Sequence, residues 1–175
     1  MASWGRVTKW DLETAASRVL LDLPPPADLI FAFSADGTRL AYADEHQVIT
    51  VWDLETEKPL TELQGPPGKG LKLAFSADGK TLAAGRQGVR VWDVDAAGAR
   101  PVNELEQTVV TSLAFSPGGK TLAINGITTN ILQWDFRQRR QRWPLRGPSF
   151  STRSLAFSPD GTLLAASGGA GSVWL

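Results

Sequence analysis

The chain has 175 residues, of which 42% are hydrophobic and 21% are charged, as expected for a soluble protein with one substantial core. Its 18 basic and 18 acidic side chains cancel, so its net charge gives no general attraction to nucleic acid or to a membrane. The absence of cysteine excludes disulfides and thiolate chemistry, and with His46 as the single histidine a zinc or copper site is excluded too.

Targeting signals are the next feature to consider. The first residues, "MASWGRVTKWD", show neither the basic nor the apolar region of a secretory signal. No apolar run approaches the roughly 20 residues that span a bilayer. We therefore expect no membrane partner and a cytoplasmic location.

Two markers recur along the chain at one spacing. The word "FAFSADGTRLAYA" (31–43) returns as "LAFSADGKTLAAG" (73–85), "LAFSPGGKTLAIN" (113–125) and "LAFSPDGTLLAAS" (155–167). A Trp-Asp dipeptide returns in the same phase, at Trp10, Trp52, Trp92 and Trp134, with spacings of 42, 40 and 42 residues. Two markers in phase indicate a repeat architecture.

The predicted elements are all strands. The chain opens with two strands, "WGRVTKWD" and "SRVLLDL", and three full sets of four strands follow. It ends with two strands and a truncated third, "GSVWL". We expect one domain, 1–175, with repeat phases of about 1–22 (partial), 23–64, 65–106, 107–146 and 147–175 (partial).

The second full repeat shows what one set contains. "GLKLAFS" alternates, "ADGK" is a tight Asp-Gly reversal, and "TLAAG" is a second strand. A turn around 86–88 leads to "VRVWDV", and "PVNELE" is a more polar fourth strand. The inner strands are apolar on both faces, with small residues at 83–85, so each sheet must pack between similar sheets. The sequence predicts an all-β array of four-stranded antiparallel sheets.

These words and the four in-phase Trp-Asp dipeptides resemble the WD40 family, whose repeats form the blades of a β-propeller. The resemblance covers essentially the whole chain. It implies about four blades per chain, a non-enzymatic protein-protein interaction scaffold, no cofactor, and an unidentified protein or peptide as partner. Nucleic acid is not an expected partner.

The chain departs from the family pattern at a buried hydrogen-bond network. Members of the family often carry a Gly-His pair and an aspartate that bond with a serine and the tryptophan. Here no histidine follows Gly65 or Gly147, and the positions six before the tryptophans hold no aspartate. We expect this network to be missing and packing to hold the blades together.

The two ends of the chain suggest how the ring closes. When the repeats are aligned, Trp10 and Asp11 correspond to the two positions that would follow Leu175. The first strands therefore look like the outer half of the last blade. Three arrangements remain open: two chains joined head to tail into an eight-bladed ring, a four-bladed monomer, or a piece of a longer propeller. The homodimer preserves the family's blade angle and covers every edge, so we favour it.

Repeated polar residues are expected to be structural. The serines of the "FS" words, with Asp36, Asp78 and Asp160, are expected to build turns, and the third copy has Gly118 instead of aspartate. No nucleophile and base pair is apparent, so we expect no catalytic residue and no enzyme. The structural blade positions are Trp10, Asp11, Trp52, Asp53, Trp92, Asp93, Trp134 and Asp135.

Two surfaces are candidates for binding. The first is built from turns at one end of the blades, where residues vary between repeats: Asp44, Glu45, His46, Lys69, Arg86, Gln87, Asn125 and Arg153. The second is a basic rim around Trp143 that could take an acidic partner or be a charged edge strand: Arg137, Arg139, Arg140, Arg142 and Arg146. An assembly unit with no separate ligand is the alternative to a scaffold.

Overall fold

The computed structural model describes residues 5–23, 30–96, 101, 103–127, 130–136, 138, 140–146, 153–167 and 173–174. Over these residues every regular element is a strand and every pairing is antiparallel, as the sequence predicts. The strands are β1 (Gly5–Trp10), β2 (Ser17–Leu23), β3 (Ile30–Phe33), β4 (Arg39–Ala43), β5 (Val48–Asp53), β6 (Lys58–Gln64), β7 (Lys72–Phe75), β8 (Thr81–Asp93), β9 (Asn103–Phe115), β10 (Thr121–Gly126), β11 (Asn130–Asp135), β12 (Arg140–Gln141), β13 (Leu145–Arg146), β14 (Ser154–Phe157), β15 (Leu164–Ser167) and β16 (Val173–Trp174).

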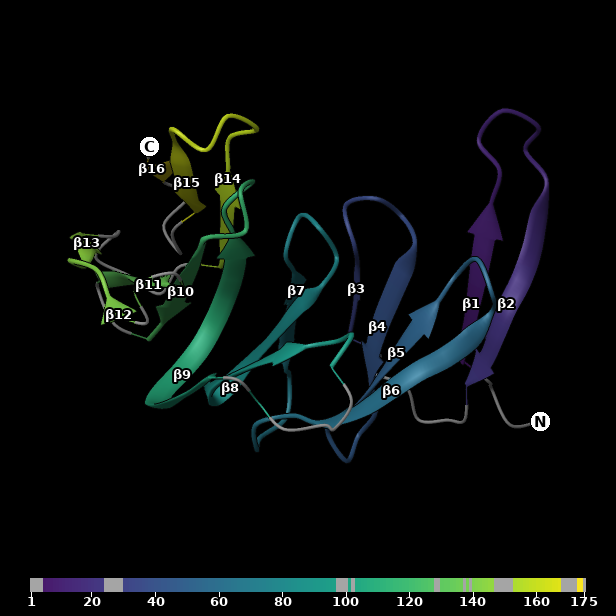
Figure 1. The fold of residues 1–175 in the computed structure, drawn as a ribbon, viewed down its shortest axis with the longest axis horizontal. Helices are drawn as coiled ribbons and strands as arrows, with labels where there is room; N and C mark the ends of the chain where they lie inside the picture. The colour runs from purple at the N-terminus through teal and green to yellow at the C-terminus, as the bar shows by residue number, and fades with distance from the viewer. Residues whose placement is uncertain are drawn as a thin grey trace.

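The sheets stand side by side in an arc (Figure 1). Blade 1 is the sheet β3-β4-β5-β6. Blades 2 and 3 share one hydrogen-bonded sheet, β7-β8-β9-β10-β11-β12, with β13 also on β11. Blade 4 is the three-stranded sheet β14-β15-β16, at the opposite end of the arc from the hairpin β1-β2.

The long strands β8 and β9 each contain two of the predicted strands. Val94 N–H donates to Lys80 O (2.9 Å), as Leu54 N–H does to Thr38 O in blade 1 (2.8 Å), so β8 turns back on itself. Gly88, with φ of 96°, lies in this reversal, where the sequence predicts a turn. Strand β9 is different, because it runs without a break from the outer edge of blade 2 into the inner strand of blade 3.

The cores lie between blades rather than inside one sheet. Each of three clusters joins neighbouring blades, and the small residues of the second strands lie at the contacts: Ala41, Ala83 and Ala123 are all 0% exposed. A Cβ on Gly85 would lie 2.8 Å from Cγ1 of Val110 in the next blade. The predicted close approach of neighbouring sheets is therefore confirmed.

Three tryptophans of the Trp-Asp dipeptides have indole N–H groups without a partner. The Nε1 atoms of Trp52, Trp92 and Trp134 are buried, and no hydrogen-bond partner lies within reach in the described part of the chain. These three indole groups take no part in the polar network that WD40 repeats often carry. Apolar packing between blades, around the 1% exposed Trp92 for example, takes its place.

The N-terminal hairpin has the structure of the outer half of a blade. Asp11 accepts hydrogen bonds from the N–H groups of Glu13 and Thr14, and Asp53 accepts from the corresponding Glu55 and Thr56. The fourth residue after each aspartate has positive φ, 55° at Ala15 and 56° at Glu57. The first two strands therefore form a hairpin of the kind that the third and fourth strands form in blade 1, and the described residues of this hairpin pair with no other sheet.

At the other end, β16 is the start of a third strand. Trp174 lies opposite Ala166, as Thr50 lies opposite Tyr42 in blade 1. Trp174 is thus not the tryptophan of a Trp-Asp dipeptide, which would come two positions later. This register agrees with the phase read from the sequence.

Candidate interaction surfaces

The first candidate surface is organised by the loop 64–70 between blades 1 and 2. Gly65 N–H donates to Gln47 O (2.9 Å), and Arg90 Nη1 donates to the carbonyls of Gln64 (3.1 Å) and Gly65 (3.0 Å). Gln87 N–H donates to Pro67 O (3.4 Å). The loop is therefore held by the turns of both neighbouring blades.

The turn at 44–47 is fixed by Asp44. Its Oδ1 accepts hydrogen bonds from the N–H groups of His46 (2.9 Å) and Val48 (2.8 Å), and Gln47 has φ of 62°. Asp44 is thus occupied by its own turn. Glu45 and His46 are exposed, with Oε1 and Nε2 3.8 Å apart, and are available to a partner.

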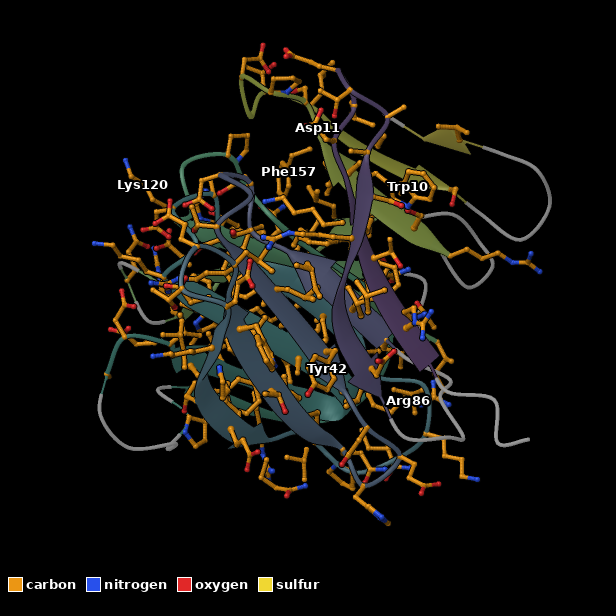
Figure 2. The ribbon with its side chains drawn as sticks, turned by 90° about the vertical axis from the view of Figure 1, so that its right-hand side faces the viewer. Trp10, Asp11, Tyr42, Arg86, Lys120 and Phe157 are labelled. Atoms are coloured by element: carbon orange, nitrogen blue, oxygen red, sulfur yellow. The ribbon has the colours of Figure 1, made fainter. Side chains whose placement is uncertain are left out.

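Cationic side chains border the same loop. Lys69 and Gln87 are exposed, and Arg86 is half-buried against Gly68, where an added Cβ would lie 3.0 Å from Arg86 Cγ. In Figure 2, Arg86 lies at the end of the blades near Tyr42, away from Lys120 and Asp11 at the other end. Arg153 is exposed at the start of β14, with its N–H donating to Ser167 O (2.9 Å).

Asn125 does not belong to this surface. It lies in β10 opposite Ile131 and is 1% exposed, and neither atom of its amide group has a hydrogen-bond partner among the residues that the structure describes. Strand β10 extends to Gly126, so the turn begins later than the sequence predicts. The assignment of Asn125 to an exposed turn was wrong.

The basic rim is partly used by the fold. Arg142 binds Asp135, with Nε 2.9 Å and Nη2 2.5 Å from Oδ2, and Asp135 is only 3% exposed in its side chain. Arg140 Nε donates to Gln138 Oε1 (2.7 Å), and Arg146 is exposed in β13. Arg137 and Arg139 lie outside the described residues. Arg142 therefore has a structural role, whereas Trp143, 91% exposed, does not pack on the blade.

The aspartates of the Trp-Asp dipeptides bind the turns that follow them. Asp93 accepts from Asp95 N–H (3.0 Å) and Asp135 from Gln138 N–H (2.9 Å), as Asp11 and Asp53 do in their turns. The N–H of Thr14 lowers the pKa of Asp11, and that of Thr56 lowers the pKa of Asp53. These side chains serve the turns, in agreement with the sequence analysis.

Comparison with known proteins agrees with this architecture. The family model for the WD domain, G-beta repeat, matches residues 140–175. Among 1267 matching chains of solved structures, one from the crystal structure of the mitotic checkpoint complex superposes with a TM-score of 0.80 at 21% identity. The family match over residues 140–175 and the shared fold support the resemblance to WD40 propellers. A search of curated proteins found no match.

The superposition also compares lengths. It covers 96% of this chain and 52% of the solved chain, so the protein spans about half the length of that neighbour. At 21% identity the likeness concerns the fold alone.

Other kinds of site find no support in the described residues. No group of three or more His, Cys, Asp or Glu side chains there could hold a metal ion. The described ranges also contain no helix long and apolar enough to cross a membrane.

The "FS" words of the repeats build polar turns of one kind. Ser34 Oγ donates to Asp36 Oδ1 (2.5 Å), and Asp36 accepts the N–H of Thr38 (3.0 Å). These hydrogen bonds lower the pKa of Asp36 to about 2. The turns at Asp78 and Asp160 repeat this arrangement, with the pKa of Asp78 lowered and that of Asp160 lowered to about 2.

The third repeat allows a test of this turn. Gly118 occupies the aspartate position, an added Cβ would meet nothing within 4 Å, and Ser116 Oγ still accepts the N–H of Thr121 (3.1 Å). We expect Gly118→Asp to stabilise the fold at pH 7 more than the control Gly118→Asn does. The Asn variant should gain only the about 0.4–1 kcal/mol that comes from the lower conformational entropy of the unfolded chain. Thermal unfolding between pH 2 and pH 7 measures the difference.

The pH dependence follows from the two pKa values. The aspartate of such a turn has a pKa of about 2 in the folded chain against an ordinary value of 3.8. The advantage of Asp over Asn should be full above about pH 4.5 and decline as pH falls towards 2. An advantage that stays constant down to pH 2 would contradict this role of the carboxylate.

Sequence reasoning missed two features of the blade contacts. Arg39 joins blade 1 to blade 2, with Nη1 2.9 Å from Gly79 O and Nη2 2.6 Å from Asp95 Oδ1. Phe31 and Phe33 form an edge-to-face pair, with centroids 6.3 Å apart, and are 63% and 52% exposed. In sequence both phenylalanines read as ordinary core positions of a repeated word.

Proposed function

We propose that this chain is a non-enzymatic protein-interaction scaffold that joins a second copy of itself to form an eight-bladed ring. WD40 propellers generally serve as scaffolds rather than enzymes, and the fold supports that role here. The finer part of the proposal, self-assembly, depends on the two ends of the arc.

The observation that carries the proposal is the exposure of Phe31 and Phe33. The corresponding residues of blade 2, Leu73 and Phe75, pack against the core between blades 1 and 2. Among the described residues no complete blade precedes blade 1, and an added Cβ on Gly37 meets nothing within 4 Å. By contrast, an added Cβ on the equivalent Gly79 would lie 3.2 Å from Cβ of Ser34 in the preceding blade.

The opposite end of the arc is open as well. In blade 3, Ile131 faces blade 4 and is 4% exposed. Val173 holds the equivalent position in blade 4, opposite Ser167, and is 68% exposed. One molecule thus has an apolar face at each end of its arc, and the two faces point in opposite directions. Such faces fit a head-to-tail assembly, because each can be covered by the opposite face of a second copy.

Four blades per chain correspond to half of an eight-bladed ring. The chain superposes with a TM-score of 0.80 on about half of a longer solved chain. A four-bladed closure would require about 90° between neighbouring blades, twice the rotation of an eight-bladed ring. A second copy completes the ring without changing the contacts between blades.

For binding other proteins, the loop 64–70 and its neighbours are the best placed surface. Glu45, His46, Lys69 and Arg86 border this loop, which hydrogen bonds hold in place, so a partner would meet a preorganised surface. Arg153 presents a further cation at the start of blade 4.

Particle mass tests the proposal directly. We expect light scattering on the 175-residue chain at micromolar concentration to give the mass of two chains. The loss of exposed apolar faces on assembly is the physical reason. A stable particle with the mass of one chain would overturn the ring, and a larger, open-ended series of masses would replace it with a filament.

A further inference from the structure

The N-terminal hairpin has a free strand edge. Asp11 N–H donates to Ala16 O, so in an alternating antiparallel ladder Val7 and Lys9 also direct their backbone groups towards β2. Thr8 and Trp10 direct theirs to the opposite side. No described strand pairs with the hairpin on that side.

Blade 1 shows which strand belongs at this edge. Its third strand, β5, directs alternate residues to the second strand β4, since Leu54 N–H donates to Thr38 O and Asp44 N–H to Val48 O. The register there is Leu40 opposite Trp52 and Ala41 opposite Val51. The hairpin β1-β2 is the equivalent of β5-β6, so it lacks a second strand.

Strand β15 offers the matching edge. It is the second strand of blade 4, and the described residues of β16 pair with it at Ala166 and Ser167. Beyond these two positions, Leu164 and Ala165 pair with β14 but with no described strand on the other side. They correspond to Leu40 and Ala41 of blade 1.

We propose that β1 of one copy pairs with β15 of a second copy, Trp10 opposite Leu164 and Lys9 opposite Ala165, and replaces β16. The resulting blade is built from two chains. The inference rests on the proposed ring and adds the strand exchange that closes it. The two strands lie at opposite ends of the arc in one molecule, so the partner strand comes from another copy (Figure 1).

Replacement of β16 follows from the pairing each strand can make. The two described residues of β16 occupy the positions that Val7 and Thr8 would take, and they pair with β15 at Ala166 and Ser167. Strand β1 has six residues and is already paired with β2. Its pairing with β15 would therefore complete a four-stranded blade with little additional loss of conformational entropy. This hybrid blade would also cover Phe31 and Phe33 of the copy that supplies β1, extending the contacts seen between blades 1 and 2.

A designed disulfide tests the register, because the native chain has no cysteine. Lys9 and Ala165 would face each other as a non-hydrogen-bonded pair, the spacing that a cross-strand disulfide fits. We expect Lys9→Cys with Ala165→Cys to give covalent dimers on mild oxidation. The control pairs Lys9→Cys with Ala156→Cys, one strand further away and beyond the roughly 7 Å limit for a disulfide.

The possible results distinguish the strand exchange from the two-chain ring on which it rests. Covalent dimers from the Ala165 pair and not from the Ala156 pair support the exchange. A two-chain particle without that disulfide, or with equal yield from both pairs, overturns the exchange and leaves the ring. A one-chain particle overturns both.

Backbone variants give an independent readout on the whole chain. Thr8→Pro removes an N–H from the free edge while leaving the ladder to β2, and should raise the dimer dissociation constant about tenfold relative to Thr8→Val. Trp174→Pro weakens the competing pairing of β16 with β15, so it should lower the dimer dissociation constant. Effects of the same sign in both variants would contradict the replacement of β16.

Discussion

Replacing Trp92 by alanine should lower the free energy of unfolding by about 3–5 kcal/mol, the largest effect we expect from a single substitution in this chain. Trp92 is 1% exposed and belongs to the cluster between blades 1 and 2, with Ile49 and Val51 on one side and Leu82 on the other. Truncation therefore leaves a cavity between two rigid sheets, which cannot collapse fully.

Two further variants separate the reasons for this loss. Trp92→Phe keeps an aromatic ring and removes an indole N–H that has no partner, so it should cost less than half as much. Trp143→Ala, at a residue 91% exposed, should change stability by less than about 0.5 kcal/mol. Urea unfolding followed by circular dichroism measures all three, and an equal loss for Trp92→Ala and Trp92→Phe would show that a polar bond matters more than packing.

The repeat made most of the fold predictable. The Ser-Asp turns and the Trp-Asp dipeptides form hydrogen bonds with residues two to five positions away. Their structure is therefore determined by nearby residues and can be predicted from a short stretch of sequence. The small residue at Gly85 could be interpreted because a periodic fold places another sheet at that position. The missing tryptophan network was predictable for the same reason, since its members should recur in every repeat.

The errors concern single residues whose surroundings were misjudged from sequence. Asn125 was assigned to a turn, but it aligns with Ala43 and Gly85, which are buried strand residues, and β10 likewise continues through it. Arg142 looked like part of a free basic surface, whereas it binds the buried Asp135 seven residues earlier. The exposure of Phe31 depends on what precedes blade 1, a property of the assembly that a repeated word does not encode.

Replacing both Phe31 and Phe33 by serine should abolish the two-chain particle while leaving each chain folded. Both side chains are more than half exposed in the single chain, so their loss should change its stability by about 1 kcal/mol, chiefly from the aromatic pair. In the ring they would become buried, and each interface would lose about 2 kcal/mol of apolar contact. With two interfaces per ring, the loss is about 4 kcal/mol, or roughly a thousandfold in the dissociation constant.

The same two positions in the next repeat provide the matched control. Leu73 and Phe75 already pack against the core between blades 1 and 2, so serine at these positions should unfold the chain rather than dissociate it. Light scattering and circular dichroism on the two double variants distinguish the cases. If the Phe31, Phe33 variant keeps the mass of two chains, the open face of blade 1 is not the contact, and the head-to-tail ring must be abandoned even if the protein is a dimer.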